Sequence, residues 1–160
     1  ILYVQPVAID PDMTSGELFD RVSAIGAKML VEVLPKIEAG KLTPKKQEES
    51  LATMAPPLTK DMARFDFTQD AAHIHNWVRG MNPWPMAFFM HDGKKIKVTA
   101  SKLSENPGNA APGSVLAVKP LTIACQDGAI VLDSVTPEGG KSMAGTAWAA
   151  GRRLKAGDIL

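Results

Sequence analysis

The sequence predicts an α+β fragment: a strand and a long helix, a polar linker, and then a small five-stranded β-barrel with flanking helices. Before residue 40, apolar residues recur every three or four positions, which indicates an amphipathic helix. After residue 86, short apolar or alternating runs are separated by Asp-Gly pairs, which are typical of β-hairpins. With 160 residues, 45% of them apolar, the chain has room for one small domain and an additional piece.

Residues 1–40 are predicted to form a strand, at 1–9, and one helix. Thr14 begins the helix as an N-cap, with Glu17 at the spacing of a capping box, and Gly40 ends it. A lone strand has no ladder partner, and the apolar stripe of the helix has no sheet to cover. We therefore expect 1–40 to be the end of a larger α/β domain whose earlier strands precede Ile1. The stripe consists of Leu18, Val22, Ile25, Met29, Val33 and Ile37.

Residues 41–67 have the composition of a linker. Polar and charged residues dominate 43–49, and Pro56-Pro57 is stiff and extended. Thr59 is expected to cap a short helical turn that runs through Arg64. Residues 68–160 are predicted to form a separate domain.

That domain begins with a helix capped by Thr68 and ending at Gly80. Asn82-Pro83-Trp84-Pro85 follows, and because proline disfavours the helical conformation in the residue before it, Asn82 and Trp84 are expected to be extended. We expect Trp84 to serve as a hydrophobic lid over the junction of helix and sheet. The apolar stripe of the helix is Ala71, Ile74, Trp77, Val78 and Met81.

Five strands are predicted after this helix, with hairpin turns at Asp92-Gly93 and Asp127-Gly128. A loop rich in Asn, Gly and Pro spans 104–112, and an Ala-rich helix at 143–151 closes the domain. Short strands between two helices are typical of a small OB-like barrel, the oligonucleotide-binding type. The five strands are expected at 87–91, 94–103, 115–118, 121–125 and 129–135.

Charge is distributed unevenly along the chain. The net charge is +1, but residues 1–50 carry −2 and residues 51–160 carry +3. The basic excess is concentrated at 92–104 and 141–160. Each of these segments has four Lys or Arg residues and one Asp. These two clusters are consistent with one electropositive face for a phosphate backbone, or with an ordinary solvated surface.

Catalytic and metal-binding patterns are absent from the sequence, so we expect no catalytic residue and no metal site. His73 and His75 lie two residues apart on a helix and cannot ligate one metal together, while His91 precedes a turn and is expected to be exposed. No P-loop, G-x-G-x-x-G or G-x-S-x-G pattern occurs. The single cysteine, Cys125, excludes a disulfide framework and is expected to be an inert core residue.

The chain has no apolar run of the roughly 18 residues that a membrane span needs, and no signal-peptide pattern. It begins with Ile1 and not with Met. We expect a piece of a longer, cytoplasmic protein.

The motif His75-Asn76-Trp77-Val78-Arg79, followed by Asn82-Pro83-Trp84-Pro85, resembles the methionyl-tRNA formyltransferase family. Further stretches resemble the same family in the same order: the last helix of its formyltransferase domain, its linker, its barrel and its terminal helix. These stretches are residues 12–18, 51–60, 112–115 and 151–157. The resemblance covers nearly the whole chain.

The resemblance implies part of a bacterial translation-initiation enzyme that transfers a formyl group from 10-formyltetrahydrofolate to methionyl initiator tRNA. In this family the reaction uses an Asn, a His and an Asp of the first domain, which by the resemblance precede Ile1. The fragment alone is thus expected to be inactive and not to bind 10-formyltetrahydrofolate. Its implied partner is initiator tRNA, which it would position, and the whole enzyme is expected to be monomeric.

Candidate tRNA-binding residues are basic residues of the linker, the first hairpin and the C-terminal tail. Lys60 matches a basic linker position of the family, whereas Pro57 stands where relatives often carry lysine. The other candidates follow from charge and predicted face. The full set is Lys60, Arg64, Lys94, Lys95, Lys97, Lys102, Arg152, Arg153 and Lys155.

Two alternatives remain at this stage. Sugar-nucleotide formyltransferases and formyltetrahydrofolate hydrolases share the two-domain arrangement, and their small barrel need not bind RNA. A stand-alone RNA-binding barrel is the other alternative, and the unpartnered strand and helix of residues 1–40 argue against it.

Overall fold

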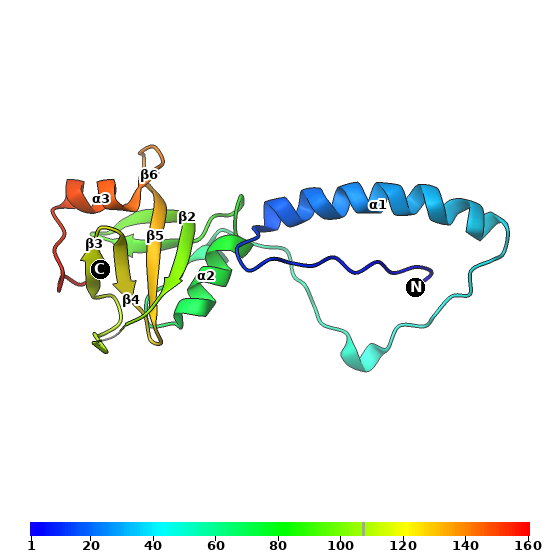
Figure 1. Ribbon diagram of the computed structural model, residues 1–160, viewed down its shortest axis with the longest axis horizontal. Helices are drawn as coiled ribbons and strands as arrows, with labels where there is room; N and C mark the ends of the chain where they lie inside the picture. The colour runs from blue at the N-terminus through cyan, green and yellow to red at the C-terminus, as the bar shows by residue number, and fades with distance from the viewer. Residues whose placement is uncertain (107) are drawn as a thin grey trace. The chain divides into compact units, whose positions relative to one another are not determined.

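The computed structural model describes residues 1–106 and 108–160, which form two compact units, Ile1–Pro57 and Leu58–Leu160. The first unit contains one long helix, and the second contains a small sheet with two helices (Figure 1). The predicted division into segments 1–40, 41–67 and 68–160 stays a prediction. The predicted loop at 104–112 includes Pro107, which lies outside the described residues.

Helix α1 (Ser15–Glu38) is the main element of the first unit. The predicted capping box is confirmed: the Glu17 backbone N–H donates to Thr14 Oγ1 at 3.3 Å, and the Thr14 N–H donates to Glu17 Oε2 at 2.8 Å. These bonds satisfy amide groups that have no partner within the helix. Pro35 lies in the last turn, and Gly40, with a φ of +63°, follows the helix end. A short 3₁₀ helix, η1 (Glu49–Leu51), completes the unit.

The strand predicted at residues 1–9 does not form. The segment has no β-ladder, and its recorded backbone bonds link the Ile1 N-terminus and carbonyl to Lys45. The physical reason is the absence of a neighbouring strand in this unit, since an isolated strand leaves its amide and carbonyl groups unpaired.

The second unit is a small α+β fold built on a six-stranded antiparallel sheet. The hairpins at Asp92-Gly93 and Asp127-Gly128 are confirmed, with positive φ at both glycines. Helix α2 packs on β2 and β5. Helix α3 packs mainly on β5 and also contacts β6, β3 and β4. The elements are η2 (Asp61–Ala63), α2 (Ala71–Gly80), β1 (Phe88–His91), β2 (Lys94–Ser104), β3 (Val115–Val118), β4 (Leu121–Ala124), β5 (Ala129–Pro137), β6 (Met143–Ala144) and α3 (Gly145–Arg152).

The predicted closed OB-like barrel is not confirmed. The strands follow the open path β1-β2-β5-β4-β3, and no ladder within the described residues joins β1 to β3. A sixth strand, β6, pairs with β5 where a helix was predicted, so α3 begins only at Gly145. Two residues are too short a run for an alternating pattern to show in the sequence.

The core of the second unit lies between the sheet and the two helices. Trp148 of α3 is buried and meets Phe89 edge-to-face, with ring centroids 5.9 Å apart. Phe65 and Phe67, from the predicted linker, are also buried in this core. Thr68 is not the cap of α2, contrary to the sequence prediction, because its amide and hydroxyl donate to Asp66 and the helix begins after Asp70.

The C-terminal residues run beside the free edge of β3. The Val115 N–H donates to the Asp158 carbonyl at 2.8 Å, and the Gly157 N–H donates to the Val115 carbonyl at 2.9 Å. The Leu160 N–H donates to the Gly113 carbonyl, also at 2.9 Å. The tail therefore pairs backbone groups that the edge strand would otherwise expose.

Candidate nucleic-acid interface

Three of the predicted RNA-contacting residues meet at one surface pocket. Lys60, Lys95 and Lys97 line a pocket of about 400 Å³ in the second unit. All three side chains are exposed, and the ion pairs recorded within residues 1–106 and 108–160 include none of them. The remaining lining residues are Trp84, Pro85, Phe88, Thr136, Pro137, Glu138, Gly139 and Gly140. We call this site the Trp84 pocket.

Strand β2 holds two of these lysines on the same side of the sheet. Ile96 and Val98 are completely buried, so the alternation of the strand turns Lys95 and Lys97 outward. Lys97 stands opposite Phe88 on β1 and opposite Thr136 on β5. This alternation of buried and exposed residues places two positive charges on one face.

Lys95 lies over an apolar surface. Its Nζ is 4.8 Å from the centroid of the Phe88 ring, a distance at which a cation is attracted to an aromatic face. Phe88 itself is buried. This contact holds the Lys95 amine near the pocket and covers the Phe88 ring.

Glu138 contributes the one acidic side chain among the lining residues. Its Oε2 accepts from the Lys95 N–H at 3.1 Å, and its own N–H donates to the Lys95 carbonyl at 2.9 Å. A turn follows, in which Gly139 has a φ of +71° and the Gly140 N–H donates to the Pro137 carbonyl at 2.9 Å. Three lysines against one glutamate leave the pocket with a positive excess.

Trp84 is not the buried lid that the sequence predicts. Its side chain is 54% exposed, and it lines the pocket beside Pro85, which is buried. Residues 81–85 form turns, and the extended conformation expected for Asn82 and Trp84 within them stays a prediction. The cause of the turns is tertiary: the Asn82 amide donates to the Thr99 carbonyl at 3.0 Å, and the Met86 N–H donates to the Met81 carbonyl at 2.8 Å, which folds the segment back.

The other linker and hairpin candidates do not line the Trp84 pocket. Arg64 is exposed, with its backbone bridged to Phe88, and Lys94 lies at the hairpin turn opposite His91. Lys102 forms an ion pair with Asp133, with Nζ and Oδ2 3.2 Å apart. That carboxylate partly neutralises Lys102, which makes it a weaker candidate than Lys97.

Arg152, Arg153 and Lys155 are exposed where α3 ends. Arg153 is the C-cap, in the left-handed region with a φ of 56°. None of the three lines the Trp84 pocket. The pocket therefore does not unite the two basic clusters, 92–104 and 141–160, into one electropositive face. RNA binding by any of the nine candidates remains a prediction.

The histidines occupy structural positions. His75 is buried, with Nδ1 3.0 Å from Ser101 Oγ, and His73 stacks on Trp77 with centroids 5.5 Å apart. His91 is not exposed as predicted: its side chain is 13% exposed and packs edge-to-face against Trp148. No group of three or more potential metal ligands occurs in the part of the chain that the structure describes.

Cys125 is buried in the core, as predicted. Burial raises the pKa of its thiol to about 12, and the negative charge of Asp70 adds to the rise. None of the helices in the described part of the chain combines the length and the hydropathy that a membrane span requires.

Residues 57–153 match the family described as "Formyl transferase, C-terminal domain". The chain belongs to this family. The formyl transferase C-terminal domain thereby includes all lining residues of the Trp84 pocket and every candidate except Lys155, which lies beyond the matched residues. It also includes Phe65 and Phe67, which the sequence analysis had assigned to the linker.

Curated relatives of this formyl transferase C-terminal domain extend the match over the whole chain. Methionyl-tRNA formyltransferase of Lachnospira eligens is 39% identical over 100% of the chain and 53% of its own length. The protein of the same name from Heliobacterium modesticaldum is 40% identical over 98% and 53%, and that from Bacillus subtilis 36% identical over 98% and 51%. The chain therefore spans about half the length of the curated relatives it matches.

Solved structures share the fold over most of this chain. HypX from Aquifex aeolicus, in a four-site variant, matches with a TM-score of 0.64 and 19% identity, over 89% of this chain and 27% of HypX. HypX in complex with tetrahydrofolic acid matches with a TM-score of 0.56 and 21% identity, over 76% and 22%. At this identity the likeness concerns the fold alone.

Proposed function

We propose that this chain is the tRNA-positioning part of a methionyl-tRNA formyltransferase. The complete enzyme would transfer a formyl group from 10-formyltetrahydrofolate to the amino group of methionyl initiator tRNA in the cytoplasm. The half of the relatives' length that this chain does not cover would supply the Asn, His and Asp of the reaction. The chain itself would hold the tRNA body so that the acceptor end reaches that site.

The observation that carries this proposal is the match over the whole chain to proteins named methionyl-tRNA formyltransferase, at 36% to 40% identity. The physical support is the Trp84 pocket, where three lysines without recorded ion pairs lie together on one face. Contacts to phosphate fix position and register without reading sequence, which is the task of a positioning domain.

The direct test is binding of initiator tRNA to the 160-residue chain at several salt concentrations. If Lys60, Lys95 and Lys97 each neutralise one phosphate, they contribute a slope of about −3 to a plot of log affinity against log salt. Each single change to alanine should weaken binding and reduce the slope by about 1.

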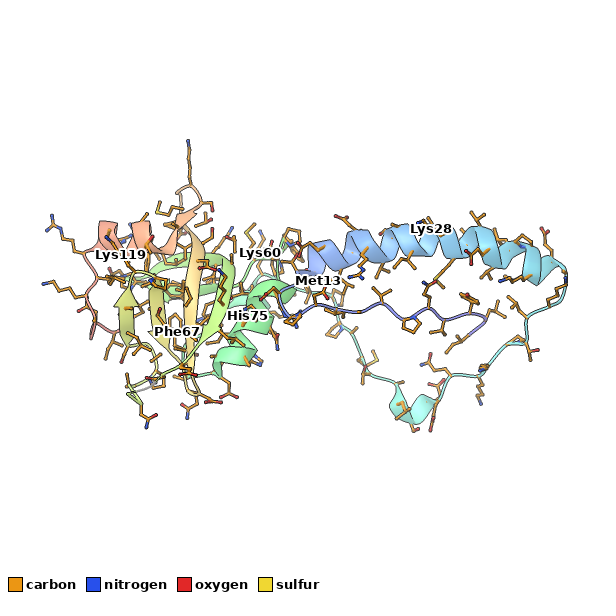
Figure 2. The ribbon with its side chains drawn as sticks, viewed as in Figure 1. Met13, Lys28, Lys60, Phe67, His75 and Lys119 are labelled. Atoms are coloured by element: carbon orange, nitrogen blue, oxygen red, sulfur yellow. The ribbon has the colours of Figure 1, made fainter. Side chains whose placement is uncertain are left out.

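Lys119→Ala serves as the matched control, because Lys119 is exposed but does not line the pocket. Figure 2 shows Lys119 and Lys60 well separated within the second unit. We expect this variant to keep the wild-type slope. Binding that is absent, or independent of salt, would contradict the proposal and favour a formyltransferase or hydrolase whose small domain does not contact RNA.

A further inference from the structure

Trp84 is an aromatic side chain whose ring is available at the surface. In the described part of the second unit, the other aromatic rings are buried or already engaged. Phe65, Phe67, Phe89 and Trp148 are in the core, and Phe88 is covered by Lys95. Trp77 stacks on His73 and donates its indole N–H to the Met62 carbonyl at 3.1 Å. Trp84 has no recorded ring contact or hydrogen bond through its side chain, and it is 54% exposed.

The segment that carries Trp84 is held in place before any ligand binds. Pro83 and Pro85 flank it, and each proline fixes its own φ angle. Pro85 is buried, and the Asn82 side chain and the Met86 amide bind the backbone of Thr99 and Met81. An aromatic ring on a rigid segment loses little conformational freedom on binding, which favours its use as a platform.

The chemistry around this ring matches a nucleotide better than a free phosphate. Lys60, Lys95 and Lys97 supply positive charge for phosphate groups. Glu138 repels phosphate, but its carboxylate accepts hydrogen bonds from an amino group of a base or from a ribose hydroxyl. The volume of about 400 Å³ lies in the range of ordinary ligand pockets.

We propose that the Trp84 pocket accepts an unpaired nucleotide of the bound RNA. The base stacks on the indole of Trp84, the adjoining phosphates contact the three lysines, and Glu138 accepts a hydrogen bond from the base or ribose. This inference rests on the proposed function, because initiator tRNA is the RNA that brings the nucleotide. Phosphate contacts alone can form with any RNA, whereas a stacked base requires that the RNA has a single-stranded nucleotide.

The test compares Trp84→Ala and Trp84→Phe in the 160-residue chain, with a single-stranded RNA of about ten nucleotides as the probe. Loss of a stacked base should weaken binding of this RNA about fivefold or more in W84A. The salt slope should stay unchanged, because Trp84 neutralises no phosphate. W84F keeps a ring and should bind within about threefold of wild type, while the quenching of tryptophan fluorescence on RNA binding is lost.

A duplex RNA with the same number of phosphates is the matched control ligand, and W84A should bind it as wild type does. Because Trp84 is more than half exposed, both variants should melt at nearly the wild-type temperature. Equal binding of the single strand by wild type and W84A would overturn the nucleotide pocket.

The outcomes separate this inference from the proposed function. If tRNA binding depends on salt and W84A leaves single-stranded RNA binding intact, the nucleotide pocket is overturned and the proposed function stands. Single-stranded RNA binding that depends on Trp84, without any tRNA binding, overturns the proposed function and supports the pocket. A wild-type chain that binds neither RNA overturns both.

Discussion

At the scale of single residues, Cys125 illustrates how burial alone sets reactivity. The thiol lies in the core just after β4, and its pKa is raised to about 12 by burial and then by the charge of Asp70. Only the thiolate reacts with alkylating agents, so this side chain should be inert at neutral pH.

We predict that iodoacetamide leaves Cys125 unmodified in the folded chain and modifies it fully in denaturant, as read by intact mass. The same shift has a pH consequence. The folded state holds the thiol proton more tightly than the unfolded state, whose pKa is near 9.0. The free energy of unfolding should therefore fall as the pH rises from about 9 towards about 12. Rapid modification of the native chain at neutral pH would contradict this assignment.

Gly145 is a second residue whose identity the fold dictates. A Cβ atom at this position would lie 1.9 Å from the Leu132 carbonyl oxygen, a backbone atom of β5. Alanine can be accommodated only if α3 moves away from the sheet.

We predict that Gly145→Ala lowers the free energy of unfolding by about 1–3 kcal/mol, measured by urea denaturation of the 160-residue chain. Gly151→Ala, in the same helix, is the matched control, because nothing lies within 4 Å of its Cβ position. That variant should be neutral or stabilising by up to about 1 kcal/mol, since alanine favours helix over glycine. Equal effects of the two changes would show that α3 does not pack closely on β5.

At the scale of elements, α1 is a long helix whose apolar side chains are largely exposed. Val33 is the only one of its residues that is buried, and large apolar side chains such as Phe19, Leu30 and Val31 are 59% to 74% exposed. Most helical stability in proteins comes from packing an apolar face, which α1 lacks in this unit.

We predict that native-state hydrogen exchange of the 160-residue chain gives weaker protection for α1 than for β5. The amides of β5 (Ala129–Pro137) are bonded to strands on both sides and serve as the internal reference. Protection of α1 equal to that of β5 would mean that its apolar face has another partner, such as a second copy of the chain.

Elements defined by local chemistry were predictable from the sequence. The capping box of Thr14 and Glu17 and the Asp-Gly hairpins depend on residues three or fewer apart, and all of them form. The strand at 1–9 failed because a strand depends on a distant partner. Strand β6, which does form, was missed because two residues show no periodicity.

The candidate site was predictable in part for the same reason. Alternation along β2 places Lys95 and Lys97 on one face, and this pattern is visible in the sequence. The contribution of Lys60, Trp84 and Glu138 to the same pocket is not visible there, because turns distant in sequence bring them together. Trp84 has a large apolar side chain, which predicts burial. Its exposure goes with the turn that the hydrogen bonds of Asn82 and Met86 hold in place.

At the scale of the whole molecule, the net charge of +1 is the sum of a negative net charge on the first unit and a positive net charge on the second. Residues 1–57 carry eight acidic and six basic side chains, and residues 58–160 carry nine acidic and twelve basic ones. An RNA approaching the chain is therefore attracted by the second unit and repelled by the first. In the proposed function, this separation would direct the encounter towards the unit that holds the Trp84 pocket.

The pairing of the last residues with β3 has a consequence for solubility. A bare edge strand offers amide and carbonyl groups in a row, which is a template for adding strands of other molecules. Here the bonds of Val115 and Gly113 to residues 157–160 occupy part of that template. A purification tag joined after Leu160 leaves these bonds in place, whereas a truncation before Gly157 would remove them and leave an edge open to intermolecular aggregation.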